Sequence, residues 1–291
     1  MKKMFMAVIA LMMTISASAQ FYIYCSDGNV IKVDSISMVA PRERPTTGNG
    51  VFSVSATTQV YFTMGNLQYN PRYAKWRIAE SQLDYIGNEN SNITSVYDGW
   101  LDLFGWSTNA TYFGVSTSTS YYNDYLGNFV DWGENEIGSD SSNVFRTLRI
   151  DEWRYILDDR SNAEELRGIA CVDGVNGLIL LPDDWSCPND VVFKAGVNTR
   201  ESIEAYGQYQ KFNIDQWSKM EAAGAVFLPA GGFRHGTEVE EVQLDGRYWS
   251  ATDGFYNYTA SNITFFSNRV GCGDGGAVRS YAGCVRLVKD L

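Results

Sequence analysis

Short apolar segments separated by clusters of Gly, Asn, Asp and Pro run along most of the chain, a pattern typical of small antiparallel strands. Turn residues such as Asp173-Gly174 lie between neighbouring segments and predict hairpins. Segment 107–143 is rich in Ser, Thr, Asn, Tyr and Gly without periodicity, so we expect a long loop there. We expect strands at residues 21–24, 30–33, 51–55, 59–64, 169–172, 178–181, 225–229 and 284–288.

Two segments have helical periodicity instead. Residues 151–159 place three apolar side chains on one helical face, namely Trp153, Ile156 and Leu157. A second helix is expected after Asn213, which forms a capping-box pair with Gln216, and Gly224 ends it. Two helices among many short strands indicate an α+β fold. The buried stripe of the second helix is expected to contain Trp217 and Met220.

The first residues have the features of a secretory signal peptide, because Lys2-Lys3 precedes an apolar run that ends in Ala17-Ser18-Ala19. We therefore expect residues 1–19 to be removed and the protein to be exported to the cell surface, the periplasm or the medium. Residues 20–47 are interpreted as a leader hairpin and linker, and residues 48–291 as one domain. No later apolar run reaches the roughly 20 residues of a transmembrane helix, so no transmembrane segment is expected.

The charge of the chain excludes one class of partner and its composition restricts the chemistry. The formal net charge is -11 and the Lys and Arg residues form no cluster, so nucleic acid is not expected as a partner. The one histidine, His235, lies in an expected turn and is interpreted as an exposed loop residue. One histidine cannot build a multi-histidine zinc site. Since no residue set forms a convincing catalytic constellation, we expect no catalytic residue, metal site or cofactor.

Five cysteines follow the signal peptide, so at least one of them is unpaired within the chain. Cys171 and Cys187 flank an expected hairpin, and Cys272 and Cys284 flank the last expected turn. Export permits disulfides, and we expect these two local pairs with Cys25 free. Sequence alone leaves other connectivities open.

A set of motifs follows in a fixed order through residues 48–291: Tyr61–Tyr69, Trp76–Glu80, Leu103–Trp106, Asp151–Trp153, Gly174–Trp185, Gly224–Ala230, Tyr248–Ser250 and Val285–Val288. Together they resemble the exported Bacteroidetes proteins of the Fibrobacter succinogenes major paralogous domain type, which are similar to C-type lectins and to formylglycine-generating enzymes. The resemblance implies a C-type-lectin-like fold in which the terminal strands meet, two helices flank small antiparallel sheets, and long loops gather on one face.

In diversified relatives of this fold the variable segment lies between the Trp-Ser motif and the closing strand, which corresponds here to residues 251–278. Tyr offers contact area at low entropic cost, and Asn, Ser and Arg offer hydrogen bonds. Alternation directs Ile263 and Phe265 inward. We expect a non-enzymatic, adhesin-like recognition module that binds an extracellular glycan or protein through the loop face of residues 253–269. The expected contacts are Phe255, Tyr256, Asn257, Tyr258, Asn262, Ser267, Asn268 and Arg269.

Two other functions stay open. A structural or accessory subunit of a surface assembly would use residues 20–44 for docking, since an exposed strand edge can pair with a partner. A copper oxidase of the formylglycine-generating type would need two closely spaced cysteines, because thiolates select copper(I). Cys272 and Cys284 are twelve positions apart, and Cys284 precedes Val285-Arg286, whereas the corresponding cysteine of the enzymes follows the Arg.

Sugar binding is a separate question. Calcium-dependent lectins carry Glu-Pro-Asn or Gln-Pro-Asp with Trp-Asn-Asp, whose oxygens suit calcium, and none of these triplets occurs. The acidic segments 131–136 and 182–185 are interpreted as turns or solvated loops. Metal-free stacking on sugar rings could use exposed tyrosines, of which the candidates are Tyr121, Tyr122, Tyr256 and Tyr258.

Overall fold

The computed structural model describes residues 21–24, 30–33, 46–106, 115–120, 127–197 and 206–291. The chain divides into two compact units, Met1–Arg44 and Pro45–Leu291. In the first unit β1 (Phe21–Tyr24) and β2 (Val30–Val33) form the predicted antiparallel hairpin. The expected signal peptide, Cys25 and the tyrosines at 121 and 122 lie outside the described residues. No described helix is long and apolar enough to cross a membrane.

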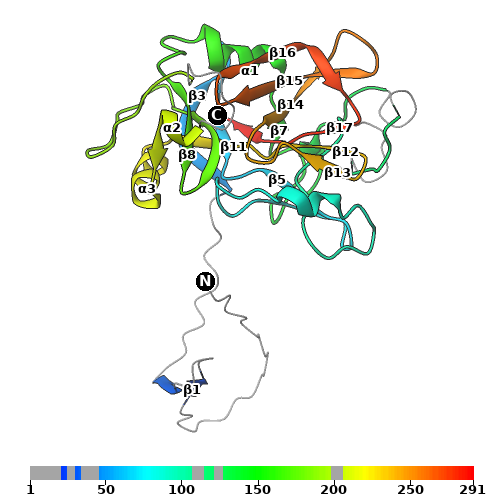
Figure 1. The fold of residues 1–291 in the computed structure, drawn as a ribbon, viewed down its shortest axis with the longest axis horizontal. Helices are drawn as coiled ribbons and strands as arrows, with labels where there is room; N and C mark the ends of the chain where they lie inside the picture. The colour runs from blue at the N-terminus through cyan, green and yellow to red at the C-terminus, as the bar shows by residue number, and fades with distance from the viewer. Residues whose placement is uncertain (1–20, 25–29, 34–45, 107–114, 121–126, 198–205) are drawn as a thin grey trace. The chain divides into compact units, whose positions relative to one another are not determined.

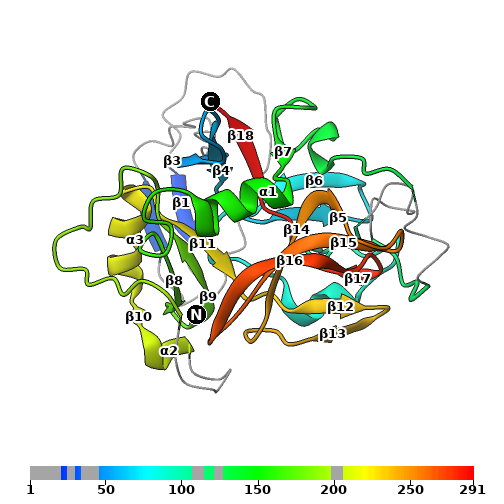
Figure 2. The ribbon, with the colours of Figure 1, turned by 90° about the horizontal axis from the view of Figure 1, so that it is seen from above.

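The second unit is an α+β domain of small, mainly antiparallel sheets with a few short helices (Figures 1 and 2). Its two ends meet in one sheet, as the resemblance implied. In this sheet β18 (Leu287–Asp290) pairs with β4 (Gln59–Thr63) on one side and β7 (Arg146–Thr147) on the other, and β3 (Thr47–Ser53) pairs with β4.

The closing strand begins later than predicted. Cys284 bridges to Tyr248, and the Arg286 guanidinium is 1 % exposed and donates to the Thr63 and Phe227 carbonyl oxygens. The segment that was expected to start the strand therefore crosses the core before the chain pairs with β4.

A second sheet has the strand order β10 (Lys211–Phe212), β8 (Arg167–Val172), β9 (Val175–Leu180) and β11 (Val226–Pro229). The predicted hairpin is β8–β9. Side chains alternate between the two faces of β9, so the strand contributes to two hydrophobic cores. Leu178 and Leu180 face one of them, which we call the central core, and Ile179 faces the other, which we call the helix core. This strand is buried on both faces, which explains its continuous apolar sequence.

The helix core is covered by α3 (Ile214–Ala222). Its capping box is formed as predicted, because the Asn213 side chain accepts from the Gln216 amide at 2.9 Å and the Gln216 side chain accepts from the Asn213 amide at 3.1 Å. Gly224 has a φ of 92°, which a glycine adopts without strain, and it follows the last turn. Trp217 and Met220 are buried beneath the helix.

The other predicted helix is α1 (Ile150–Arg154), which continues as a π-helical turn over Tyr155–Asp159. Its expected apolar face is buried, with Trp153, Ile156 and Leu157 each 0 % exposed. A short helix α2 (Tyr206–Tyr209) was not predicted. Two short 3₁₀ helices, Gly87–Ser91 and Trp132–Glu134, lie in long connections.

The C-terminal third of the domain forms two neighbouring sheets (Figure 2). One contains β14 (Gly246–Asp253), β15 (Thr259–Phe266) and β16 (Arg269–Val278), and the other contains β13 (Glu238–Glu240), β12 (Phe233–His235) and β17 (Tyr281–Ala282). Residues 253–269 were expected to present a loop face, but Thr259–Phe266 within them is paired strand.

His235 is not an exposed loop residue, as the sequence had indicated. It ends β12, pairs with Tyr281 of β17, and is half-buried with its ring centroid 4.5 Å from that of Tyr281. Gly236, with a φ of 61°, makes the turn one residue later.

A separate hairpin, β5 (Leu67–Asn70) with β6 (Lys75–Ile78), packs on a third core that is rich in tryptophan. Both of its outer edges are occupied: Tyr69 bridges to Leu101, and Trp76 bridges to Ile137. The segments that contain Leu101 and Ile137 are therefore held against the hairpin.

The two expected disulfides are not formed in the structure, and all four cysteines concerned carry free thiols. Cys171 is buried in β8 beside Lys211, whereas Cys187 lies in an exposed loop and donates to the Val191 carbonyl oxygen at 3.3 Å. Cys272 pairs with Ile263 inside the β15–β16 ladder, whereas Cys284 bridges to Tyr248. Proximity along the chain misled the prediction, because strand pairing sets the neighbours of each thiol.

Candidate functional site

The predicted contact residues fall into two groups at opposite ends of β15. Residues 255–258 form the β14–β15 turn, and residues 267–269 lie at the β15–β16 turn. At about 3.3 Å per residue, β15 holds the two turns roughly 25 Å apart. The predicted set is therefore not one surface.

Two of the predicted contacts are not accessible to a ligand. Asn262 is 4 % exposed because it lies in the middle strand of the sheet, between Trp249 and Gly273. Ser267 is 0 % exposed. Asn268 and Arg269 are exposed, but the Arg269 guanidinium donates to Thr264 at 3.4 Å and lies 5.6 Å from the Phe266 ring. The inward orientation of Ile263 and Phe265 is confirmed, since both are 0 % exposed.

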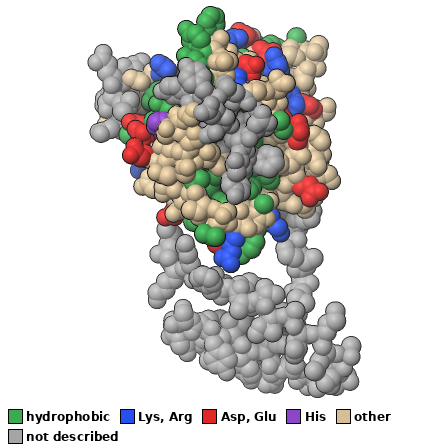
Figure 3. All heavy atoms as spheres, turned by 90° about the vertical axis from the view of Figure 1, so that its right-hand side faces the viewer, with side chains coloured by type: hydrophobic (Ala, Val, Ile, Leu, Met, Phe, Trp, Pro, Cys, Tyr) green, Lys and Arg blue, Asp and Glu red, His purple; other side chains and the backbone are tan. Residues whose placement is uncertain are grey.

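The β14–β15 turn presents three aromatic rings, which we call the aromatic turn and define as residues 255–258. Phe255 is 82 % exposed and Tyr256 is 54 % exposed. Phe255 meets Tyr256 edge to face at 5.0 Å, and Tyr256 stacks on Tyr258 at 5.3 Å with nearly parallel planes. In Figure 1 the turn lies at the upper right, and hydrophobic side chains protrude at the corresponding upper edge of Figure 3.

Backbone and side-chain hydrogen bonds fix the shape of the aromatic turn. The Thr259 hydroxyl donates to the Tyr256 carbonyl oxygen at 3.0 Å and accepts from the Tyr256 amide at 3.1 Å. The Gly254 amide donates to the Thr259 carbonyl oxygen, and a Cβ at Gly254 would lie 2.1 Å from the Thr259 hydroxyl, so only glycine fits there. The turn is consequently ordered before any ligand arrives.

Arg279 supports the turn from below. Its Nε donates to the Thr259 carbonyl oxygen at 2.9 Å, its Nη2 lies 3.4 Å from the Asp253 carboxylate, and its guanidinium lies 4.2 Å from the Trp106 ring centroid. Burial lowers the pKa of Arg279, which Asp253 partly offsets. A buried cation thus anchors the exposed rings to the tryptophan-rich core.

The acidic segments that were interpreted as turns have structural partners. Asp131 accepts from the amides of Gly133 and Thr147 and caps the 3₁₀ helix. Asp183 accepts from the Ser53 amide at 2.7 Å and pairs with Arg160 at 3.0 Å. Among the described residues, no group of three or more His, Cys, Asp and Glu side chains is placed to hold a metal ion.

The two C-terminal cysteines occupy different environments. Cys284 is 0 % exposed, whereas Cys272 is partly exposed and packs against the same core. Burial raises the pKa of the Cys284 thiol well above its usual range, and the nearby Asp102 adds to this shift. The thiolate that would bind a soft metal is therefore disfavoured at this position.

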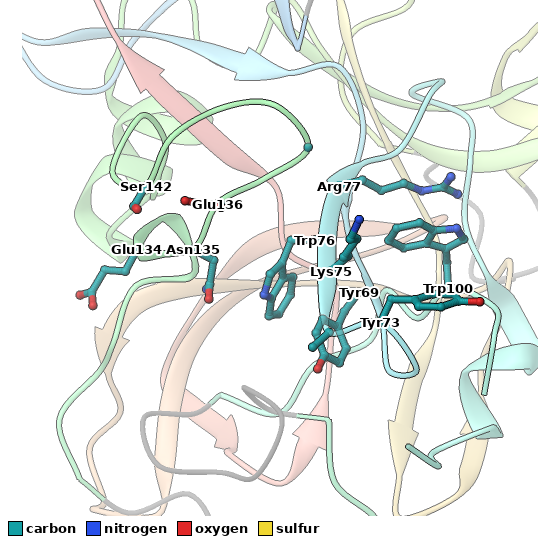
Figure 4. Close-up of a pocket in the computed structure, with 12 residues that line it drawn as sticks. Tyr69, Tyr73, Lys75, Trp76, Arg77, Trp100, Glu134, Asn135, Glu136 and Ser142 are labelled. Atoms are coloured by element: carbon teal, nitrogen blue, oxygen red, sulfur yellow. The ribbon is translucent and has the colours of Figure 1, made fainter. Parts of the chain in front are cut away.

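A second surface was not predicted. A cleft of about 830 Å³ lies between the β5–β6 hairpin and the segment after the 3₁₀ helix Trp132–Glu134 (Figure 4). Tyr69 and Trp76 line it from the hairpin, with ring centroids 4.6 Å apart. Tyr73 from the hairpin turn and Trp100 from the next loop extend the aromatic lining.

One signal for the cleft was present in the sequence. Three aromatic residues, Tyr69, Tyr73 and Trp76, lie within eight positions around a polar turn. Tyr69 and Trp76 were used only for the family resemblance, and Tyr73 was not used. The acidic residues of segment 131–136 were dismissed as a solvated loop, yet Glu134 and Glu136 line the opposite side of the cleft. Their meeting depends on the bridge between Trp76 and Ile137, which local pattern does not reveal.

Comparison of the chain with protein-family models, with curated proteins and with solved structures found no match.

Proposed function

We propose that the protein is an exported, non-enzymatic recognition module with a C-type-lectin-like fold, and that it binds an extracellular protein or glycan through the aromatic turn. The observation that carries the proposal is the exposure of Phe255 and Tyr256 on a hydrogen-bonded scaffold. Exposed apolar groups that cluster together are typical of interaction sites. The meeting of β4 and β18 supports the fold assignment, as does the position of the turn between the Trp249 and Cys284 segments.

Rigid aromatic side chains make efficient contacts, because few rotatable bonds are frozen when they bind. The stacked rings of Tyr256 and Tyr258 are already aligned with their planes 4° apart. Asn257 adds an exposed amide within the same turn. The turn therefore combines apolar area with hydrogen-bonding groups, a composition that is common in binding loops.

The test uses the chain from residue 20 onward as bait. Phage-displayed random peptides and a glycan array are screened on the wild type, and the ligands obtained are titrated against a Phe255→Ser/Tyr256→Ser double variant. We expect a loss of about 100-fold or more in affinity, since central aromatic contacts contribute about 2 kcal/mol each. The matched control is Val192→Ser, which replaces an apolar side chain that is 77 % exposed elsewhere.

The folded state should be equally stable in all three proteins, as measured by urea unfolding. Ligands that bind the double variant as tightly as the wild type would place the contact surface elsewhere. Selection of peptides but not glycans, or the reverse, would identify the class of ligand.

A further inference from the structure

We propose that the cleft beside the β5–β6 hairpin is a second binding site, separate from the aromatic turn, and that it takes a neutral oligosaccharide. The proposal does not rest on the function of the turn. The cleft has a volume of about 830 Å³, which is within the roughly 300–1,000 Å³ range of small-molecule sites.

The aromatic lining supplies surfaces for the apolar faces of sugar rings. Tyr73 is 55 % exposed and Trp100 is half-buried, so both present ring surface to the cleft, whereas Trp76 is 6 % exposed and lies deeper. Trp76 is fixed by Tyr69 at 4.6 Å and by Phe104 at 5.4 Å. The deepest ring in the wall of the cleft is therefore held by the core.

Arg77 orders the half-buried tryptophan. Its guanidinium lies 3.9 Å from the Trp100 ring centroid, and its Nε donates to Gln68 Oε1 at 2.8 Å. Burial lowers the pKa of Arg77, and Glu80 and Asp84 oppose this shift. The Arg77 guanidinium stacks on one face of the Trp100 ring and so holds the ring in a fixed position in the wall of the cleft.

The polar groups around the rings match hydroxyl groups. In Figure 4 Glu134, Asn135 and Ser142 lie on one side of Trp76, and Lys75 and Arg77 lie on the other. The Asn135 amide nitrogen donates to the Trp132 carbonyl oxygen at 2.9 Å, which leaves its own carbonyl oxygen as an acceptor. Among the described residues, neither Glu134, Glu136 nor Lys75 forms an ion pair.

These groups favour a neutral, hydroxyl-rich ligand over other classes. The charges of the two carboxylates, Glu134 and Glu136, offset those of the two cations, Lys75 and Arg77. The lining therefore has little net charge, and a strongly charged ligand gains little from the cleft as a whole. A purely apolar ligand would remove water from the charged side chains without replacing their hydrogen bonds. An extended peptide cannot add to the hairpin, because the Gly138 amide already donates to the Trp76 carbonyl oxygen at 2.9 Å and Leu101 covers β5.

The test titrates cellohexaose, chitohexaose and mannohexaose into the chain from residue 20 onward, by calorimetry and by tryptophan fluorescence. We expect at least one hexasaccharide to bind with a Kd below about 1 mM. Tyr73→Ala and Glu136→Gln replace exposed side chains, so both variants should fold, and each should weaken binding about tenfold or more. Trp100→Ala should reduce the fluorescence change, leaving only the contribution of the deeper Trp76, while retaining the circular dichroism spectrum.

Two controls separate this site from the aromatic turn and from metal-dependent binding. The Phe255→Ser/Tyr256→Ser double variant should bind the hexasaccharide as the wild type does, and so should the wild type in the presence of a chelator. The proposal is overturned if none of the three hexasaccharides binds below about 1 mM. It is also overturned if Tyr73→Ala binds as tightly as the wild type, if the turn variant loses binding, or if the chelator abolishes it.

Discussion

The aromatic turn and the cleft both present aromatic rings to solvent, but they hold those rings in different ways. In the turn, Phe255, Tyr256 and Tyr258 contact one another, and hydrogen bonds from Thr259 and Arg279 set the backbone beneath them. In the cleft, the rings nearest the core also stabilise the fold. Binding at the turn should therefore be separable from stability, whereas binding at the cleft should be only partly separable.

The largest expected effect is on the core side of the cleft. Trp76→Ala should lower the free energy of unfolding by about 3–5 kcal/mol, because it deletes a large buried side chain and leaves a cavity between Tyr69 and Phe104. Phe255→Ala at the turn should change it by less than about 0.5 kcal/mol. Urea unfolding of both variants gives the comparison. A loss of more than about 1.5 kcal/mol in Phe255→Ala would mean that the turn, too, belongs to the core.

The segment that follows Trp100 contains a buried acid, Asp102, two residues later. Its carboxylate is 1 % exposed and accepts from the Asn90 amide group at 2.8 Å and from the Ile86 backbone amide at 3.0 Å. Burial raises the pKa of Asp102 to about 6, although these hydrogen bonds partly oppose the shift. An ordinary aspartic acid in the unfolded chain has a pKa of about 3.9.

The raised pKa gives stability a definite pH dependence. Between about pH 4 and 6 the folded state binds more protons at Asp102 than the unfolded state does, so stability falls as pH rises. The slope approaches about 1.4 kcal/mol per pH unit near pH 5, and the full difference of about 3 kcal/mol accumulates between about pH 3 and pH 7. Below about pH 3 and above about pH 7 both states carry the same charge on Asp102, and its contribution is constant.

Asp102→Asn removes this titration and serves as the test. The stability of the wild type relative to the variant should fall by about 2 kcal/mol from pH 4 to pH 6 and by up to about 3 kcal/mol from pH 3 to pH 7, and then level off. Taking the difference removes the contribution of the other carboxylates. A difference that stays constant across this window would show that Asp102 ionises as an ordinary aspartic acid in the folded protein.

Local patterns predicted the local parts of the fold and failed where distant segments meet. The capping box of Asn213 and Gln216 and the β8–β9 hairpin each depend on residues close in sequence, so both were predictable. The burial of Asn262 depends on two flanking strands. The cleft requires the hairpin, the Trp100 loop and the segment around Glu134 to converge, and no single segment carries that information.

The predicted contact set shows the same limit within one strand. Composition directed attention to the polar aromatic interval, and two of its residues, Phe255 and Tyr256, are among the exposed large hydrophobic side chains of the described residues. Composition could not show that Thr259–Phe266 runs as a paired strand and carries residues 267–269 to the far end of the sheet.

A smaller effect than those of Trp76→Ala and Asp102→Asn is expected from the hydroxyl that shapes the aromatic turn. Thr259→Val keeps the side-chain volume but removes the two hydrogen bonds to Tyr256, one donated and one accepted. The unfolding free energy should fall by about 1 kcal/mol, because the Tyr256 amide can exchange its lost partner for water. Thr264→Val on the same strand is the matched control, since its hydroxyl accepts a longer bond of 3.4 Å from Arg269.

The informative readout is the affinity for a ligand selected on the wild type. If the turn binds because its rings are aligned in advance, Thr259→Val should weaken that affinity several-fold although every ring is still present, and Thr264→Val should leave it unchanged. Equal affinities for Thr259→Val and the wild type would instead show that the ligand arranges the rings as it binds. In that case the exposed area of the rings, and not the hydrogen-bonded scaffold, would define the turn as a site. The turn would then differ further from the cleft, whose deepest rings are held in place by the core.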